Sequence, residues 1–329
     1  MDNDWQDPAW RTAAHDWVIA HLDAPATGPV EEMRARPWSV THSVPTGAGR
    51  RWFKANITDC RYEAVLADAL GRRWPDRVLA PLAIDAARGW LLTADAGPTL
   101  RDEIHAMRAT TDASATDRNA LIGRWSEMLR SYAELQREVT PHASELLALG
   151  VPDHRPAALP GQLAELLDDP AVRADLGPDR LATVSAVTPA FAVWCAELAD
   201  SGVPATIQHD DLTDANVFAG PPYRFFDWGD AGVAHPFGSL LVALSYAAYA
   251  LDLRPGAPEL ARLRDAYLSG WPGDPAMLRR AASLACRVTR FSRAMSWRRA
   301  LRDAALPVSD DFRTAVADWL SELPEPDPV

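Results

Sequence analysis

The first hundred residues combine apolar runs of strand length with two helical stripes. Apolar positions recur every three or four residues between positions 4 and 22, which predicts an N-terminal helix. A second helical stripe covers residues 58–70, where Thr58 or Asp59 is the expected helix cap. Alternating apolar residues bounded by turn residues predict the strands, at positions 38–44, 51–57, 78–82 and 89–95. The pattern therefore predicts a small lobe of about five strands with one long helix after the second predicted strand.

The pattern becomes mainly helical from residue 99 onward. Residues 119–139 carry a strongly periodic apolar face, which predicts a helix that supports the following polar loop from behind. Further helices are predicted at 189–199, 237–251 and 278–301, and only short helical pieces are expected between 140 and 182. The chain is thus predicted to be an α+β protein of two parts, residues 1–97 and residues 98–329.

One stretch of the second part is unusually rich in polar groups at strand ends. A short strand around Ile207 runs into a polar loop that contains His209, Asp211 and Asn216. Two further short strands follow around a Pro-Gly turn, and the second ends at Asp227. Phosphoryl transfer requires a carboxylate at the attacking hydroxyl and oxygen ligands for magnesium. These residue types at these strand ends therefore indicate phosphoryl transfer.

The basic residues are almost entirely arginine. The chain has 33 lysine and arginine residues together, and Lys54 is the single lysine. Ammonium and guanidinium groups are not interchangeable at sites that need a compact cation, so Lys54 is a candidate phosphate-binding residue. Glu63 lies nine residues later, at the edge of the apolar stripe of the predicted helix. We expect its carboxylate to pair with Lys54 and to hold the ammonium toward a phosphate.

The order of these motifs carries a family resemblance. His209-x-Asp211-Leu212-x-x-x-Asn216, followed by Asp227-x-Gly229, is similar to the catalytic and metal loops of protein kinases. The chain resembles the aminoglycoside phosphotransferase and choline kinase-like superfamily. The resemblance implies a bilobal protein-kinase-like fold, with a small antiparallel-sheet N-lobe that contains one long helix and a larger, mainly helical C-lobe.

The resemblance also implies roles for individual residues. Asp211 would be the catalytic base, with His209 bracing its loop. Asn216 and Asp227 would bind Mg²⁺, and Lys54 would contact the phosphates of ATP or GTP. Asp210 stands where protein kinases have an arginine, which favours a small-molecule substrate over a protein. Ser239 stands where relatives often carry an aspartate, and this departure affects a structural contact behind the loop.

Two further segments of the small lobe are candidate nucleotide contacts. Gly47 and Gly49 lie in the turn between the first two predicted strands, which we expect to cover the nucleotide phosphates. An ordinary β-turn needs the same glycines. Thr93 and Asp95 end the last predicted strand, whose backbone groups are expected to face the adenine or guanine ring.

Composition narrows the partners and the location. The net charge of −12 argues against nucleic-acid binding. The longest apolar run, 237–251, is shorter than the roughly 20 residues that span a bilayer, so no membrane partner is expected. The N-terminus lacks the pattern of an export signal, which favours a cytoplasmic location. A monomer or homodimer is expected. Most of the excess acid follows residue 97, and this favours a cationic acceptor.

Several functions remain open at this point. The leading hypothesis is an ATP- or GTP-dependent phosphotransferase that acts on a hydroxyl of an aminoglycoside or another cationic antibiotic, in resistance or self-protection. The alternative within the same class is a metabolic kinase for an amino sugar, an amino alcohol or a nucleoside. A catalytically silent nucleotide-binding module is the alternative of another class. A metal-dependent phosphohydrolase would need further histidines in a helical motif, and the sequence has no such motif.

Overall fold

The computed structural model describes residues 5–110 and 115–325, and its chain divides into two compact units. The first unit comprises Met1–Gly97, Arg224–Asp230 and Ser296–Arg313, and the second comprises Pro98–Tyr223, Ala231–Met295 and Thr314–Val329. The units divide the chain between Gly97 and Pro98, where the sequence analysis placed its boundary. The two later segments of the first unit lie in the part that the sequence analysis assigned to the larger lobe. The predicted α+β class is confirmed.

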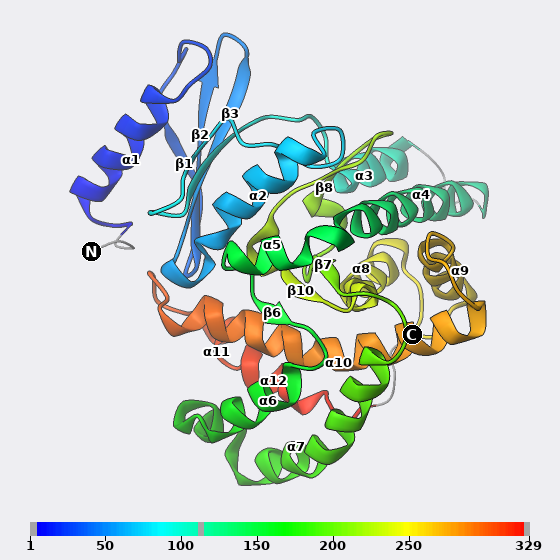
Figure 1. Ribbon diagram of the computed structural model, residues 1–329. Coiled ribbons are helices and arrows are strands. Elements are labelled where there is room, and N and C mark those ends of the chain that lie inside the picture. The colour runs from blue at the N-terminus through cyan, green and yellow to red at the C-terminus, as the bar shows by residue number, and fades with distance from the viewer. Residues whose placement is uncertain (1–4, 111–114, 326–329) are drawn as a thin grey trace. The chain divides into compact units, whose positions relative to one another are not determined.

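The first unit is built on a five-stranded antiparallel sheet (Figure 1). Its order is β1-β2-β3-β5-β4, and the strands are β1 (Glu31–Arg36), β2 (Ser39–Thr46), β3 (Gly49–Asn56), β4 (Ala83–Asp85) and β5 (Trp90–Ala94). The strand β1 was not predicted, because it is an exposed edge strand with the charged sequence EEMRAR. The strand expected at 78–82 is wrong. The nearest strand, β4, begins only at Ala83, and Val78 forms an isolated bridge to Phe225.

Two helices cover opposite faces of this sheet. On one face, α1 (Pro8–Ala20) places Trp17 against Phe53 of β3 and Trp90 of β5, with ring centroids 5.8 and 5.7 Å apart. Because successive strand residues point to opposite faces, Lys54 faces α2 (Tyr62–Arg73) on the other side. The expected cap at Thr58 or Asp59 is wrong: Thr58–Cys60 form a short 3-10 turn, and α2 has no side-chain cap.

The second unit is mainly helical, as predicted, and contains a three-stranded sheet. That sheet has the order β6-β10-β7, from β6 (Asp153–His154), β10 (Gly232–Ala234) and β7 (Thr206–Gln208). The helices that belong wholly to this unit are α3 (Leu100–Thr110), α4 (Ala115–Val139), α5 (Ala143–Ala148), α6 (Leu159–Asp168), α7 (Pro170–Ala199), α8 (Leu240–Leu251), α9 (Pro258–Leu268) and α12 (Ala315–Ser321). The helix α10 (Pro275–Arg302) contributes residues to both units, and α11 (Asp310–Arg313) belongs to the first. Two short strands flank the predicted Pro-Gly turn, β8 (Val217–Phe218) in the second unit and β9 (Arg224–Phe225) in the first.

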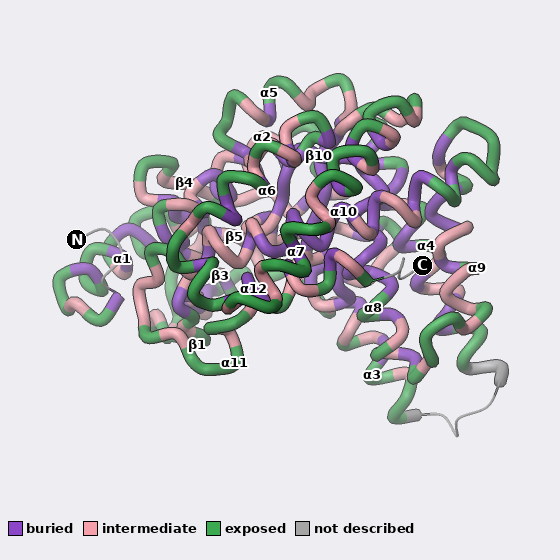
Figure 2. Tube along the Cα trace, turned by 90° about the horizontal axis from the view of Figure 1, so that it is seen from below, coloured by how far each residue is buried: buried purple, intermediate pink, exposed green. Residues whose placement is uncertain are grey.

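The helix α4 packs against several elements of the second unit, among them α9, β7 and α8. Its inward face is fully buried at Trp125, Met128, Leu129 and Tyr132, and the helix packs against α9 (Figure 2). This burial follows the spacing of three and four residues that the sequence analysis identified. The helix ends at Val139, close in the chain to Gln136, whose side chain reaches β7.

The helix α7 is long and apolar enough, by length and composition alone, to suit a membrane span. Its most apolar window has a mean hydropathy of 1.5, and 22% of that window is buried. Buried positions in its second half, at Val184, Phe191, Cys195 and Leu198, are spaced by seven, four and three residues and so lie on one face. The helix packs against α6 and α12, and Gly177, with φ 68° and ψ 171°, breaks its first turns from the rest. One-sided packing within the unit accounts for this pattern.

Candidate active site

In the first unit, Lys54 lies between two carboxylates. Its Nζ donates to Glu63 Oε1 and Oε2 at 2.9 and 2.7 Å, and to Asp227 Oδ1 at 2.6 Å. Asn56 Nδ2 donates to Glu63 Oε2 at 2.8 Å, so the buried carboxylate is fixed from two sides. Burial opposes the charged form of Lys54, but the Asp227 and Glu63 carboxylates outweigh burial and raise the pKa of the ammonium. The expected Lys54–Glu63 pair is present, and Lys54 stays charged.

The backbone around Asp227 is specialised. Asp227 has φ 64°, a left-handed conformation that only Asp227 and Asp252 adopt among the described residues other than glycine. Gly229 follows it, and a Cβ there would lie 3.0 Å from Glu63 Oε2 and 3.6 Å from Lys54 Nζ. Tyr62 of α2 donates its hydroxyl to the Gly229 carbonyl. A side chain at Gly229 would therefore crowd the Glu63 carboxylate of the ion cluster.

In the second unit, the catalytic-loop residues contact one another. Asn216 Nδ2 donates to the Asp211 carbonyl at 2.8 Å and to Asp211 Oδ2 at 2.9 Å. The buried His209 accepts the Asp211 N–H at Nδ1, 3.3 Å away. The 3-10 turn Asp214–Asn216 completes the loop after β7. These contacts fix the carboxylate of Asp211 by an amide and hold its backbone by an imidazole.

Neutral side chains hold this loop from behind. The Tyr132 hydroxyl accepts the His209 backbone N–H at 2.8 Å, so α4 supports the loop as the sequence analysis expected. Gln136 Nε2 donates to the Ile207 carbonyl at 2.7 Å, and Tyr267 donates to Gln136 Oε1 at 2.5 Å. Ser239 donates to the Tyr132 hydroxyl at 3.4 Å. An uncharged network therefore surrounds Ser239, where the family resemblance led us to expect an aspartate.

One functional contact was missed by the sequence analysis. Arg293 of α10 is 6% exposed; its Nη1 donates to the Asp210 carbonyl at 2.8 Å, and its Nη2 lies 3.9 Å from Asp211 Oδ1. The segment has several arginines, and nothing in their spacing distinguishes Arg293. Its fixed guanidinium orients the loop and places a positive charge behind the proposed base.

The remaining predicted residues lie on the sheet of the first unit. Gly49 has φ 98°, and Thr46 Oγ1 donates to its carbonyl at 2.6 Å, so the β2–β3 turn itself requires a glycine. A Cβ on Gly47 would meet no atom within 4 Å. Thr93 is paired with Trp52 of β3. The Asp95 backbone N–H donates to the Arg50 carbonyl at 3.0 Å, so this N–H is not available to a nucleobase.

Both units contain oxygen donors of a kind that suits a magnesium ion. Mg²⁺ prefers carboxylate and carbonyl oxygens, and Asp227 and the Asn216 Oδ1 atom are donors of this kind. The Lys54 cluster has two carboxylates for one ammonium, so a divalent cation would compensate its negative charge. No group of three or more His, Cys, Asp or Glu side chains with the arrangement of a metal site occurs among residues 5–110 and 115–325. A histidine-rich or cysteine-rich metal centre thus has no candidate within these ranges.

The structure gathers the predicted polar residues into two sets. Lys54, Glu63 and Asp227 contact one another in the first unit, although 173 positions separate Lys54 from Asp227. His209, Asp211 and Asn216 contact one another in the second. The four positions at the β2–β3 turn and at the end of β5 belong to the first unit.

The comparisons with solved structures address the fold. No family model and no curated protein matches the sequence. A Plasmodium vivax ethanolamine kinase is 12% identical, with a TM-score of 0.59 over 88% of this chain and 80% of that chain. A macrolide 2'-phosphotransferase type I is 12% identical, with a TM-score of 0.56 over 95% of this chain and 97% of that chain. A macrolide 2'-phosphotransferase from Brachybacterium faecium is 17% identical, with a TM-score of 0.55 over 95% and 98%. These similarities confirm the predicted kinase-like fold.

Proposed function

We propose that this protein transfers the γ-phosphoryl group of ATP or GTP to a hydroxyl of a small molecule. The observation that carries the proposal is the position of Lys54, the single lysine, between Glu63 and Asp227. A compact ammonium fixed by one buried carboxylate is suited to bind phosphate oxygens. The second set of residues, around Asp211, then supplies the group that accepts the hydroxyl proton.

The proposed roles follow from the contacts. Asp211 is the base, and its carboxylate is oriented by Asn216 and backed by Arg293. Asn216 and Asp227 would hold Mg²⁺, which when bound neutralises charge on the phosphates. Lys54 orients the donor phosphates, and His209 keeps the Asp211 backbone in place. Alignment and charge neutralisation account for most of the rate enhancement in this type of reaction.

The names of the similar structures support two acceptor classes. Two of them are macrolide phosphotransferases and one is an ethanolamine kinase. Modification of an antibiotic and phosphorylation of a metabolic alcohol are therefore both candidate functions for this chain. The shared reaction, phosphoryl transfer to a hydroxyl, is the part that the site residues support directly.

The test is nucleotide consumption over a panel of hydroxyl compounds, with mass spectrometry of the products. Asp211→Asn should reduce phosphoryl transfer by about 10²- to 10⁴-fold, because the base is lost while its hydrogen bonds are largely kept. Asp179→Asn, which changes an exposed aspartate on α7, is the matched control and should retain wild-type turnover. Equal transfer by wild type and Asp211→Asn would contradict the assignment of the base.

A further inference from the structure

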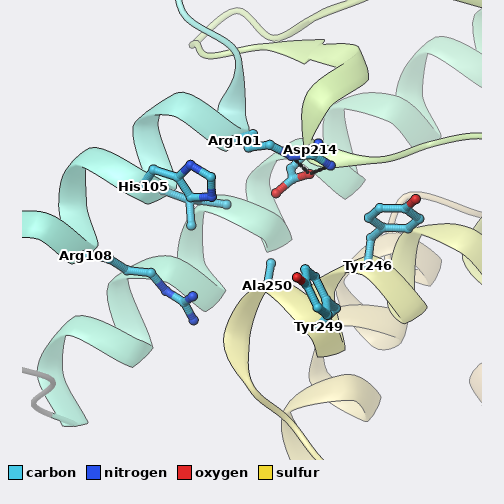
Figure 3. A pocket seen from close by; sticks show the side chains of 8 residues that line it. Arg101, His105, Arg108, Asp214, Tyr246, Tyr249 and Ala250 are labelled. Atoms are coloured by element: carbon cyan, nitrogen blue, oxygen red, sulfur yellow. Dashed lines mark hydrogen bonds and ion pairs between the residues drawn. The ribbon is translucent and has the colours of Figure 1, made fainter.

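A cavity of about 290 Å³ lies between α3 and α8 within the second unit (Figure 3). Arg101, His105 and Arg108 line it from α3, and Tyr246 and Tyr249 line it from α8. Asp214 forms part of the wall between them. Each of these side chains has a polar atom, so the cavity offers several groups that can recognise a polar ligand.

The cavity adjoins the catalytic loop. Asp214 follows Asp211 by three residues and begins the same 3-10 turn that contains Asn216. Burial raises the pKa of the Tyr246 hydroxyl, and the negative charge of Asp211 adds to this increase. The Tyr246 hydroxyl is therefore within electrostatic reach of the proposed base. A ligand in this cavity would lie beside the loop that carries Asp211.

The charge of the lining is positive on balance. Asp214 is almost completely buried, and its Oδ1 atom accepts hydrogen bonds from Nε and Nη2 of Arg101, at 2.9 and 2.7 Å. This pair largely cancels its own charge. Arg108 is exposed and forms no ion pair with any residue in the described parts of the chain. Arg108 therefore leaves positive charge for a ligand to meet.

The tyrosines supply the other half of the recognition surface. Tyr249 is 86% exposed and Tyr246 is 39% exposed, an unusual degree of exposure for two large side chains on one apolar helix. Their ring faces can pack against a planar or sugar ring while their hydroxyls remain solvated. The Arg101 guanidinium lies 5.9 Å from the centroid of the Tyr246 ring, so one wall combines a cation with an aromatic face.

We propose that this cavity binds the acceptor and selects one that carries an anionic group, a carboxylate or a phosphate, attached to a ring that packs against Tyr246 and Tyr249. The inference rests on the proposed phosphotransferase function and names its acceptor class. It differs from the cationic acceptor that the overall charge favoured. Charges beyond about 8–10 Å are largely screened at physiological salt, so the residues that line the cavity outweigh the net charge of the chain.

The test uses four benzyl alcohols that differ only in the group opposite the hydroxymethyl: a carboxylate, a phosphate, an aminomethyl group or a second hydroxymethyl. Binding to the full-length protein is measured by calorimetry without nucleotide, so the result does not depend on turnover. The anionic compounds should bind about tenfold or more tightly than the amine, the effect of one charge-assisted contact. The stronger of the two anionic compounds identifies a carboxylated or a phosphorylated acceptor.

Two variants locate the effect. Arg108→Glu reverses an exposed charge in the cavity and should weaken binding of the anionic compounds about tenfold or more while leaving the neutral diol nearly unchanged. Arg130→Glu makes the same change on the exposed side of α4 and should have no effect. The inference is overturned if the amine binds as tightly as the anionic compounds, if none of the four binds, or if both variants behave alike. Absence of phosphoryl transfer by the wild type in the nucleotide-consumption panel would instead contradict the proposed function.

Discussion

The two sets of site residues are held by different forces. In the first unit, Lys54, Glu63 and Asp227 bring three charges into direct contact, with no separation above 2.9 Å. In the second unit, Asp211 depends on neutral donors and acceptors, which are Asn216, His209 and the hydroxyl of Tyr132 behind them. Arg293 is a charged member of that network.

This difference corresponds to the task proposed for each set. A group that binds phosphates must offer a positive charge in a fixed position. Carboxylates on two sides hold the Lys54 ammonium in place, and this arrangement carries the free-energy cost of burying charged groups. A general base must remain able to accept a proton, which several strong ionic partners would prevent. Hydrogen bonds from neutral groups can orient a carboxylate and still leave it able to accept a proton. The two sets should therefore respond differently to substitution.

The largest expected effect comes from changing the ionic set without changing its charge. Lys54→Arg should reduce kcat/KM for nucleotide about 10²-fold or more, because a planar guanidinium cannot take the position of a compact ammonium between two carboxylates. Steady-state kinetics would measure the loss. Arg34→Lys makes the opposite exchange at an exposed position on strand β1, outside the ion cluster, and should not affect the kinetics. Near-normal turnover by Lys54→Arg would contradict the claim that the site needs the ammonium of the single lysine.

An intermediate effect is expected from the neutral network. Tyr132→Phe leaves the buried His209 N–H without its acceptor, which should lower the free energy of unfolding by about 1–3 kcal/mol. Ser239→Ala should cost less, about 1 kcal/mol or below, because its hydrogen bond to Tyr132 is long at 3.4 Å. Urea denaturation of both variants tests the order. A larger loss for Ser239→Ala would show that the serine, rather than the tyrosine, supports the loop.

The most gradual effect is a loss of stability in acid. Burial lowers the pKa of His235 to about 3, and burial together with His15 and Arg11 lowers the pKa of His42 to about 4, against an ordinary value of 6.5. Between the ordinary and the lowered pKa values, the unfolded chain binds one more proton at each histidine than the folded chain. Stability should therefore fall by about 1.4 kcal/mol per pH unit for each histidine as the pH decreases below 6.5.

Denaturation between pH 7 and 5 measures this slope, and His42→Gln should remove about half of the contribution of the two histidines. His42 lies in the first unit and His235 in the second, so the measurement compares the units directly. An unchanged slope in His42→Gln would mean that His42 is already protonated in the folded protein.

The fold was predictable where local pattern and packing agree. The apolar stripe of α4, the strands β2, β3 and β5 and the Lys54–Glu63 pair all follow from the spacing of residues in one element or in two adjacent ones. The charged strand β1 has no such pattern, because an edge strand with both faces accessible to solvent needs no apolar alternation. The position of β4 was missed because residues 78–82 are apolar for a different reason: Val78 is buried beside Phe225.

The candidate site was predictable in its motifs and not in its support. The catalytic-loop residues are close in sequence, so their contacts could be expected from the motif alone. Arg293, by contrast, contacts a loop more than 80 positions earlier, and Gln136 reaches Ile207 across 71 positions. Contacts over such separations depend on how helices pack, which a single sequence does not encode in any local pattern. The cavity beside Asp214 has the same origin, since α3 and α8 are far apart in the chain.

A chain with a single side-chain amine has an unusual chemical property. Reagents that acylate neutral amines have one lysine to modify, and the carboxylates around it keep that lysine protonated and poorly nucleophilic. Any event that withdraws Asp227 from Lys54 would release the amine to such a reagent. The reactivity of this one nitrogen is therefore a built-in reporter of whether the ion cluster is assembled.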